Sequence, residues 1–142
     1  MTTQGLQRFV EAQQPVYDSV CTELKAGRKT SHWMWFIFPQ LKELGRSNMA
    51  RYYGIESLQE AREYGLHPVL GERLRECTEL VLAVPGKTAH EIFGTPDELK
   101  FRSCMTLFAQ ACVDEPVFVR ALVRFFNAKP DSATLDLLSP RA

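Results

Sequence analysis

The longest apolar run of the chain lies within Ser31-His32-Trp33-Met34-Trp35-Phe36-Ile37-Phe38 and ends at Pro39. From Trp33 to Phe38 every residue is apolar, so this run belongs inside the molecule. Its composition favours a buried strand, but so short a run does not distinguish a strand from a helix. No other segment alternates well enough to pair with it, and a lone strand would leave its backbone without hydrogen bonds. We therefore predict a short buried helix with Ser31 as its N-cap.

Helix signals fill the sequence on both sides of this run. Pro68 begins the clearest amphipathic pattern, which continues to Val84. Its apolar positions follow the 3.6-residue period: Leu70, Leu74, Cys77, Val81 and Val84. Ser57 with Glu60, and Thr88 with Glu91, have the spacing of capping boxes and predict two further helix starts.

Two more helices are expected in the C-terminal part. Thr95-Pro96-Asp97-Glu98 is a helix start, with a cap, a proline and two acids at the positive end of the dipole. The segment 114–128, with Asp114 as a possible cap, is apolar nearly all round. We predict an all-α fold, a compact multihelical single domain over residues 1–142 with its core over about residues 6–138. The aromatic-rich helix lies at its centre.

Composition restricts the function classes. The chain has 142 residues, 45% of them hydrophobic, with 17 basic and 17 acidic side chains. A net charge of zero argues against general nucleic-acid binding, which needs an excess of cations to replace phosphate counterions. The N-terminus has no signal-peptide pattern, and no apolar run is long enough to span a membrane. We expect a cytoplasmic protein that binds neither nucleic acid nor membrane.

The four cysteines show no metal-binding or disulfide pattern. Cys21, Cys77, Cys104 and Cys112 have no CxxC or CxxH spacing, and each lies in an apolar helical pattern. We expect reduced, mostly buried thiols. No metal site and no cofactor motif is predicted.

Three loops combine a glycine, cations and hydroxyl groups: 27–32, 45–48 and 94–103. A helix N-terminus flanked by cations suits a phosphate or carboxylate. If the loops converge, one pocket would bind an anionic small molecule, and nucleotide-like ligands are among the candidates. The proposed ligand-binding residues are Lys29, Ser31, Trp33, Trp35, Arg46, Ser47, Lys100 and Arg102. His32 and Ser103 are the candidates for hydrogen bonding or proton transfer to the ligand.

Each of these residues also has a simpler interpretation. In that interpretation the cations complement helix dipoles or pair with Asp97 or Glu98, His32 is a hydrogen-bonded core residue, and the tryptophans only fill the core. The sequence does not establish whether the protein is an enzyme. As an alternative function, the helix Asp114–Ala128 is apolar enough to mediate protein interaction or homodimerisation, with Arg120 and Arg124 setting its register.

The stretch from Gly27 to Leu41 resembles the signature of an uncharacterised bacterial family, domain of unknown function 1810. So do Leu44-Gly45-Arg46-Ser47, the tract 67–77 and the tract 92–108. The resemblance extends from about Leu6 to about Leu138 and implies a multihelical fold with a short buried central helix. Some members are labelled calpastatin, although inhibitors of that name are disordered and this composition is globular.

The family has no established activity, so the resemblance implies no catalytic residue. Cys104 stands where the pattern predicts a second serine after Ser103. That departure weakens any mechanism that needs a hydroxyl group at this position.

Overall fold

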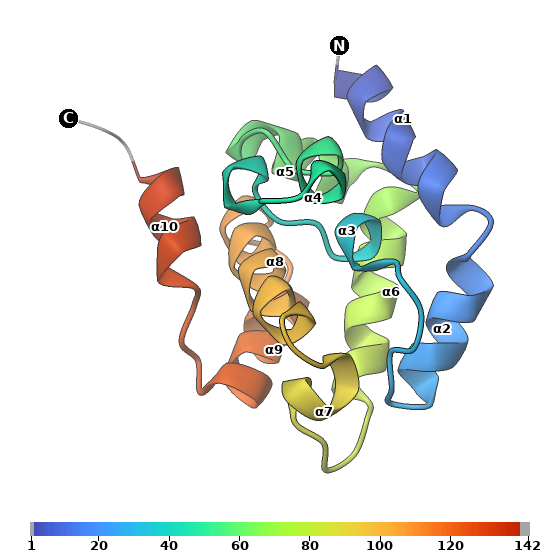
Figure 1. Ribbon diagram of the computed structural model, residues 1–142. Coiled ribbons are helices and arrows are strands. Elements are labelled where there is room, and N and C mark those ends of the chain that lie inside the picture. Colours follow the sequence, from blue (N-terminus) through green and yellow to red (C-terminus); the bar gives the residue numbers. More distant parts are fainter. Residues whose placement is uncertain (1, 140–142) are drawn as a thin grey trace.

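The computed structural model describes residues 2–139, with side chains from residue 5 onward (Figure 1). Over this range the chain forms ten α-helices and one 3₁₀ turn, and no strand is present. The elements are α1 (Thr2–Gln13), α2 (Tyr17–Lys25), α3 (Met34–Ile37), η1 (Lys42–Leu44), α4 (Asn48–Tyr52), α5 (Leu58–Leu66), α6 (Leu70–Leu82), α7 (Ala89–Phe93), α8 (Asp97–Ala111), α9 (Val117–Phe126) and α10 (Ser132–Leu138). The all-α prediction is confirmed. No helix in the described part is both long and apolar enough to cross a bilayer.

Helices α6 and α8 form the centre of the bundle (Figure 1). α8 packs against α5, α7, α9 and α10, while α6 packs against α2, α5 and α9. From Phe101 to Phe108, every α8 residue except Arg102 is buried. The amphipathic pattern of α6 likewise places its apolar positions in the core.

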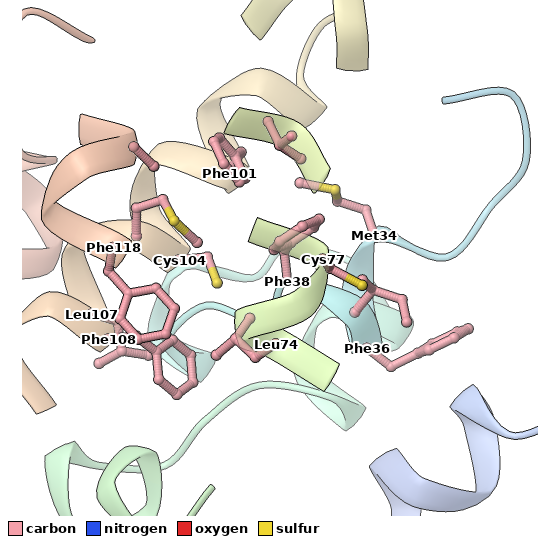
Figure 2. Packing of buried hydrophobic residues seen from close by; sticks show 14 of the residues in the cluster. Met34, Phe36, Phe38, Leu74, Cys77, Phe101, Cys104, Leu107, Phe108 and Phe118 are labelled. Atoms are coloured by element: carbon pink, nitrogen blue, oxygen red, sulfur yellow. The ribbon is translucent and has the colours of Figure 1, made fainter. Parts of the chain in front are cut away.

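The aromatic run forms the predicted buried helix, but the helix is shorter than expected. α3 has one turn and begins at Met34, with Trp33 at the N-cap position. Ser31 is not the cap, because its hydroxyl instead donates to the carboxylate of Glu23. Phe38 follows α3 and lies amid the core cluster (Figure 2). Its ring contacts Phe101 edge-on, with 5.0 Å between the ring centroids.

Helix caps were predicted with mixed success. Thr88 and Glu91 form the complete capping box, and Ser57 caps α5 through the Glu60 amide at 3.1 Å. The Glu60 carboxylate, however, accepts from the amide of Glu56 at 2.8 Å. That second capping box is therefore incomplete. Asp114 is not a cap either, because α9 starts after Pro116 and has no side-chain cap.

All four cysteines are free thiols. Cys77 and Cys104 are buried, whereas Cys21 and Cys112 are partly exposed. Burial raises the pKa of the Cys104 thiol well above its usual value. At neutral pH this thiol is protonated and behaves as a small apolar core residue.

Candidate functional site

The two proposed ligand-binding lysines meet at one carboxylate. Lys29 Nζ lies 2.8 Å from Asp97 Oδ2, and Lys100 Nζ lies 3.8 Å from Asp97 Oδ1. The ammonium group of Lys29 also lies 5.2 Å from the ring centroid of Trp33, and that of Lys100 lies 5.8 Å from the ring centroid of Trp35. The loops 27–32 and 94–103 therefore lie side by side, with cations over aromatic rings.

This lysine–tryptophan cluster leaves little room for a ligand. The Lys29 side chain is only 9% exposed, and the Asp97 carboxylate already occupies the position that an external anion would take. The crevice beside Trp35 and Lys100 has a volume of about 10 Å³, which is the space of roughly one water molecule. In this arrangement the two ammonium groups share one carboxylate of the chain.

The loop between α2 and α3 is organised by Glu23, which the sequence analysis did not identify. The carboxylate accepts hydrogen bonds from the amides of Thr30 and Ser31 at 2.8 and 3.1 Å, from the Ser31 hydroxyl, and from the Trp33 indole at 2.9 Å. Burial opposes ionisation, but these hydrogen bonds lower the pKa of Glu23 to about 2. His32 is exposed, so it is not a core histidine.

The remaining predicted site residues have polar partners outside this cluster or none among the described residues. The Arg102 guanidinium donates to the carbonyl of Lys129 at 2.9 Å. Ser103 is buried, and its hydroxyl donates to the Leu99 carbonyl one turn earlier at 3.1 Å. Ser47 serves as the N-cap of α4, and Arg46 is exposed without an ion pair among the described residues. Within the described residues, no hydrogen bond or ion pair joins these four side chains to Lys29 or Lys100.

His90, Thr95 and Glu98 form an exposed polar cluster that suggests a catalytic triad. His90 Nδ1 lies 3.0 Å from both Glu98 Oε1 and Thr95 Oγ1, and the Thr95 hydroxyl donates to Glu98. In a catalytic triad, the nucleophile and the acid contact different ring nitrogens of the histidine. Because both contacts use Nδ1, this cluster does not have that geometry.

A cleft of about 290 Å³ opens where the end of α5, the middle of α6 and the end of α8 meet. We call it the Arg62 cleft. It is lined by Arg62, Gly65, Leu66, Arg75, Ala111, Cys112, Val113, Asp114 and Glu115. Leu66 and Val113 are among its lining residues and are 84% and 80% exposed. An exposed apolar rim with charged groups beside it is typical of a ligand-binding cleft.

The two arginines of the Arg62 cleft are differently bound. Arg75 Nε lies 3.6 Å from Glu115 Oε1, and its guanidinium is 3.4 Å from the Gly65 carbonyl. Arg62 is exposed and has no ion pair or side-chain hydrogen bond within the described part of the chain. Burial raises the pKa of the Cys112 thiol, and Arg75 and Arg62 only partly offset this effect. The thiol therefore stays protonated at neutral pH.

The cleft depends on glycine at position 65. A Cβ atom there would lie 2.5 Å from Cys112 Sγ, closer than atoms can approach without displacement. At Gly71, the nearby start of α6, a Cβ atom would lie 2.1 Å from the Gly65 carbonyl oxygen. Gly65 thus permits a close contact between α5 and the end of α8, and Gly71 permits one between α6 and the end of α5; together they shape this side of the cleft.

The family model of a protein of unknown function, DUF1810, matches residues 3–138. The chain belongs to the DUF1810 family. This confirms the family resemblance seen in the aromatic run and the surrounding tracts. Among solved structures, the crystal structure of the conserved hypothetical protein Rv1873 from Mycobacterium tuberculosis is 53% identical to this chain. The match covers 96% of this chain and 97% of that one, with a TM-score of 0.94.

No curated protein matches this DUF1810 chain. The site must therefore be argued from its own residues. Arg62 and Arg75 lie on polar helix faces. Because arginines are common at such positions, no sequence motif identifies these two as site residues. One signal was present: Leu66 and Val113 are apolar residues at helix ends, where polar side chains are usual. Among the described residues of this DUF1810 fold, no cluster of three or more metal-ligating side chains occurs.

Proposed function

We propose that the protein binds a small molecule with an apolar part and one anionic group, and that the ligand occupies the Arg62 cleft. The observation that carries the proposal is Arg62 itself, a guanidinium at an apolar cleft of about 290 Å³ without an ion pair among the described residues. Small-molecule sites are concave, mostly apolar and furnished with a few polar groups that orient the ligand, and their usual volume begins near ~300 Å³.

The chemistry of the lining determines the ligand class. An arginine fork matches a carboxylate or phosphate through two parallel hydrogen bonds. Arg75 is only loosely paired with Glu115, at 3.6 Å, so it can turn toward the same anionic group. Leu66 and Val113 are exposed without a ligand, and burying them would add hydrophobic stabilisation of the complex. A short-chain carboxylate or alkyl phosphate satisfies both requirements.

This proposal keeps the anionic ligand predicted from the sequence but places it at arginines rather than lysines. Lys29 and Lys100 already share Asp97, and the crevice beside them accommodates no more than about one water. Binding there would require the ligand to displace a carboxylate of the chain. The Arg62 cleft needs no such exchange. The proposal is one of binding alone, since it assigns no nucleophile.

A thermal-shift screen tests this function. The probes are inorganic phosphate and a series of straight-chain monocarboxylates and alkyl phosphates of increasing length. Stabilisation should grow with chain length and be small for phosphate alone. A ligand at one hundred times its dissociation constant adds about 2.7 kcal/mol to the free energy of unfolding.

Two matched variants localise the binding. Arg62→Ala should abolish the ligand-induced shift, whereas Arg46→Ala, which also removes an exposed arginine without an ion pair in the described chain, should retain it. Equal shifts in both variants, or no shift with any probe, would contradict the proposal.

A further inference from the structure

A second hollow lies along the outer side of α9, where this helix meets the end of α6. We call it the α9 groove. Its volume is about 440 Å³, and it is lined by Leu82, Pro116, Val119, Arg120, Val123 and Arg124. It shares no lining residue with the Arg62 cleft. Any role of the α9 groove is thus independent of the proposed ligand site.

Two valines expose an apolar stripe along this groove. Val119 and Val123, one helical turn apart, are 50% and 55% exposed. The opposite side of α9 already supplies the core, through Phe118, Ala121 and Leu122. β-Branched residues lose side-chain freedom in a helix, so exposed valines do not stabilise α9 by propensity. A second apolar face is typical of a helix that is covered on both sides.

The groove is held open by contacts between α6 and α9. Arg124 donates to the carbonyls of Leu82 and Val84, which satisfies backbone acceptors at the end of α6. One turn earlier, Arg120 lies 3.2 Å from Glu79. The Arg124 contacts fix the wall of the groove without using its valines, and they leave the Arg120–Glu79 pair free to exchange between copies. A preformed wall reduces the entropy lost on association.

We propose that the occupant of the α9 groove is α9 of a second copy, related by a two-fold axis. In a two-fold interface the same surface patch of each copy faces that of the other. The patch must therefore carry both a positive and a negative group, so that each pairs with its opposite on the second copy. Of the two arginines that line the groove, Arg124 donates to the carbonyls of Leu82 and Val84. The groove edge still meets this condition because Arg120 and Glu79, on different helices, supply one cation and one anion for pairing between copies. Both side chains are more than half exposed, at 54% and 55%. Each can therefore pair across the axis, Arg120 of one copy with Glu79 of the other.

The balance of charge favours this occupant over a strongly acidic or basic partner. A strongly basic partner would meet Arg120 and Arg124, and a strongly acidic partner would meet Glu79. The whole chain has no net charge, so two copies approach without long-range repulsion. The valine stripes then pack against each other at the centre, with the charged pairs at the rim, as in other protein interfaces.

Sedimentation equilibrium over a range of protein concentrations tests the dimer. The wild-type protein should dissociate from dimer to monomer on dilution. Val123→Glu should be monomeric throughout, because it places a charge at the centre of the interface. Leu99→Glu is the matched control: Leu99 on α8 has the same 55% exposure but lies outside the groove, so this variant should dimerise like the wild type.

A charge-exchange experiment separates pairing between copies from pairing within one copy. Arg120→Glu alone leaves two acids at the groove edge, and Glu79→Arg alone leaves two arginines. Each variant should dimerise at least tenfold more weakly than the wild type. An equimolar mixture of the two should recover the wild-type affinity, because opposite charges then meet across the axis while each copy still repels within itself.

Three results would overturn the proposal. They are a wild-type protein that stays monomeric at the highest concentrations, a Val123→Glu variant that still dimerises, and a mixture no tighter than its components. Circular dichroism and thermal unfolding of each variant confirm that the chain is folded, so that loss of the dimer is not loss of the fold.

Discussion

The indole N–H of Trp33 donates a 2.9 Å hydrogen bond to the carboxylate of Glu23. Trp33 is fully buried, and the same carboxylate accepts from two backbone amides of the loop that precedes α3. One side chain of α2 thus fixes both the loop and the first residue of the aromatic run. A buried donor that loses its acceptor costs more free energy than the hydrogen bond itself contributes.

Replacing Glu23 with alanine should therefore destabilise the fold. We expect the free energy of unfolding, measured by urea denaturation, to fall by about 2 kcal/mol, since the indole and two amides lose their acceptor. Glu72→Ala is the control, because Glu72 is exposed on α6 and makes no side-chain hydrogen bond or ion pair with the described residues. A similar loss in both variants would show that Glu23 has no special role.

The same carboxylate should give the protein a characteristic acid dependence. Hydrogen bonds lower the pKa of Glu23 from its ordinary 4.5 to about 2 in the folded state. A depressed folded-state pKa contributes stability that is complete above the unfolded-state pKa and is lost as pH falls toward the folded-state pKa. Urea unfolding of the wild type between about pH 5 and pH 2 should lose this contribution progressively. In Glu23→Gln the slope of stability against pH should be smaller over that range, and an unchanged slope would be evidence against the assigned pKa.

The Lys29–Asp97 ion pair should be costly to break from one side. Both groups are largely shielded, with side chains 9% and 19% exposed. Asp97→Ala leaves the Lys29 ammonium without its carboxylate, and removal of one partner of such a pair costs up to about 3 kcal/mol. The Lys29→Met/Asp97→Ala double variant should lose less than the sum of the single variants. Asp136→Ala, at an exposed position of α10, should be nearly neutral, and strictly additive losses would mean that the pair is not coupled.

Gly65→Ala should destabilise the protein, although alanine is the better helix former. Alanine within a helix ordinarily gains roughly 0.5–1 kcal/mol over glycine. Here the added Cβ would lie 2.5 Å from Cys112 Sγ, and overpacking costs about 1–3 kcal/mol. Adding Cys112→Ala to the same chain removes the sulfur and should restore most of the loss. If the single variant is instead more stable, the contact between α5 and the end of α8 is looser than described.

Most of the fold could be predicted from the sequence because its signals are local. Capping residues such as Ser57 and Thr88, and the 3.6-residue period of 70–84, depend on neighbours within a turn or two. α3 was predicted by exclusion, since an unpaired strand cannot satisfy its backbone. Its start was wrong because the competing acceptor for Ser31, Glu23, lies on a different helix.

The candidate site was much harder to predict. That Lys29 and Lys100 would lie near each other was a guess about packing. The alternative that a cation pairs with Asp97 came from its position within a turn of Lys100, but the sequence does not indicate that Lys29 shares the same carboxylate. The Arg62 cleft arises only where three helices meet, so no spacing in the sequence encodes it. The orientation of an exposed arginine depends on tertiary contacts, and the local sequence pattern does not predict these contacts.

The edge-on contact between Phe38 and Phe101 also has a consequence for biosynthesis. A single turn such as α3 is not stable in isolation. Phe38, the residue that follows α3, packs against Phe93 of α7 and Phe101 of α8. During synthesis on the ribosome, the apolar run from Trp33 to Phe38 therefore emerges well before the side chains that bury it. Until α8 has been synthesised, the nascent chain carries an uncovered aromatic stretch, which is the kind of segment that chaperones recognise.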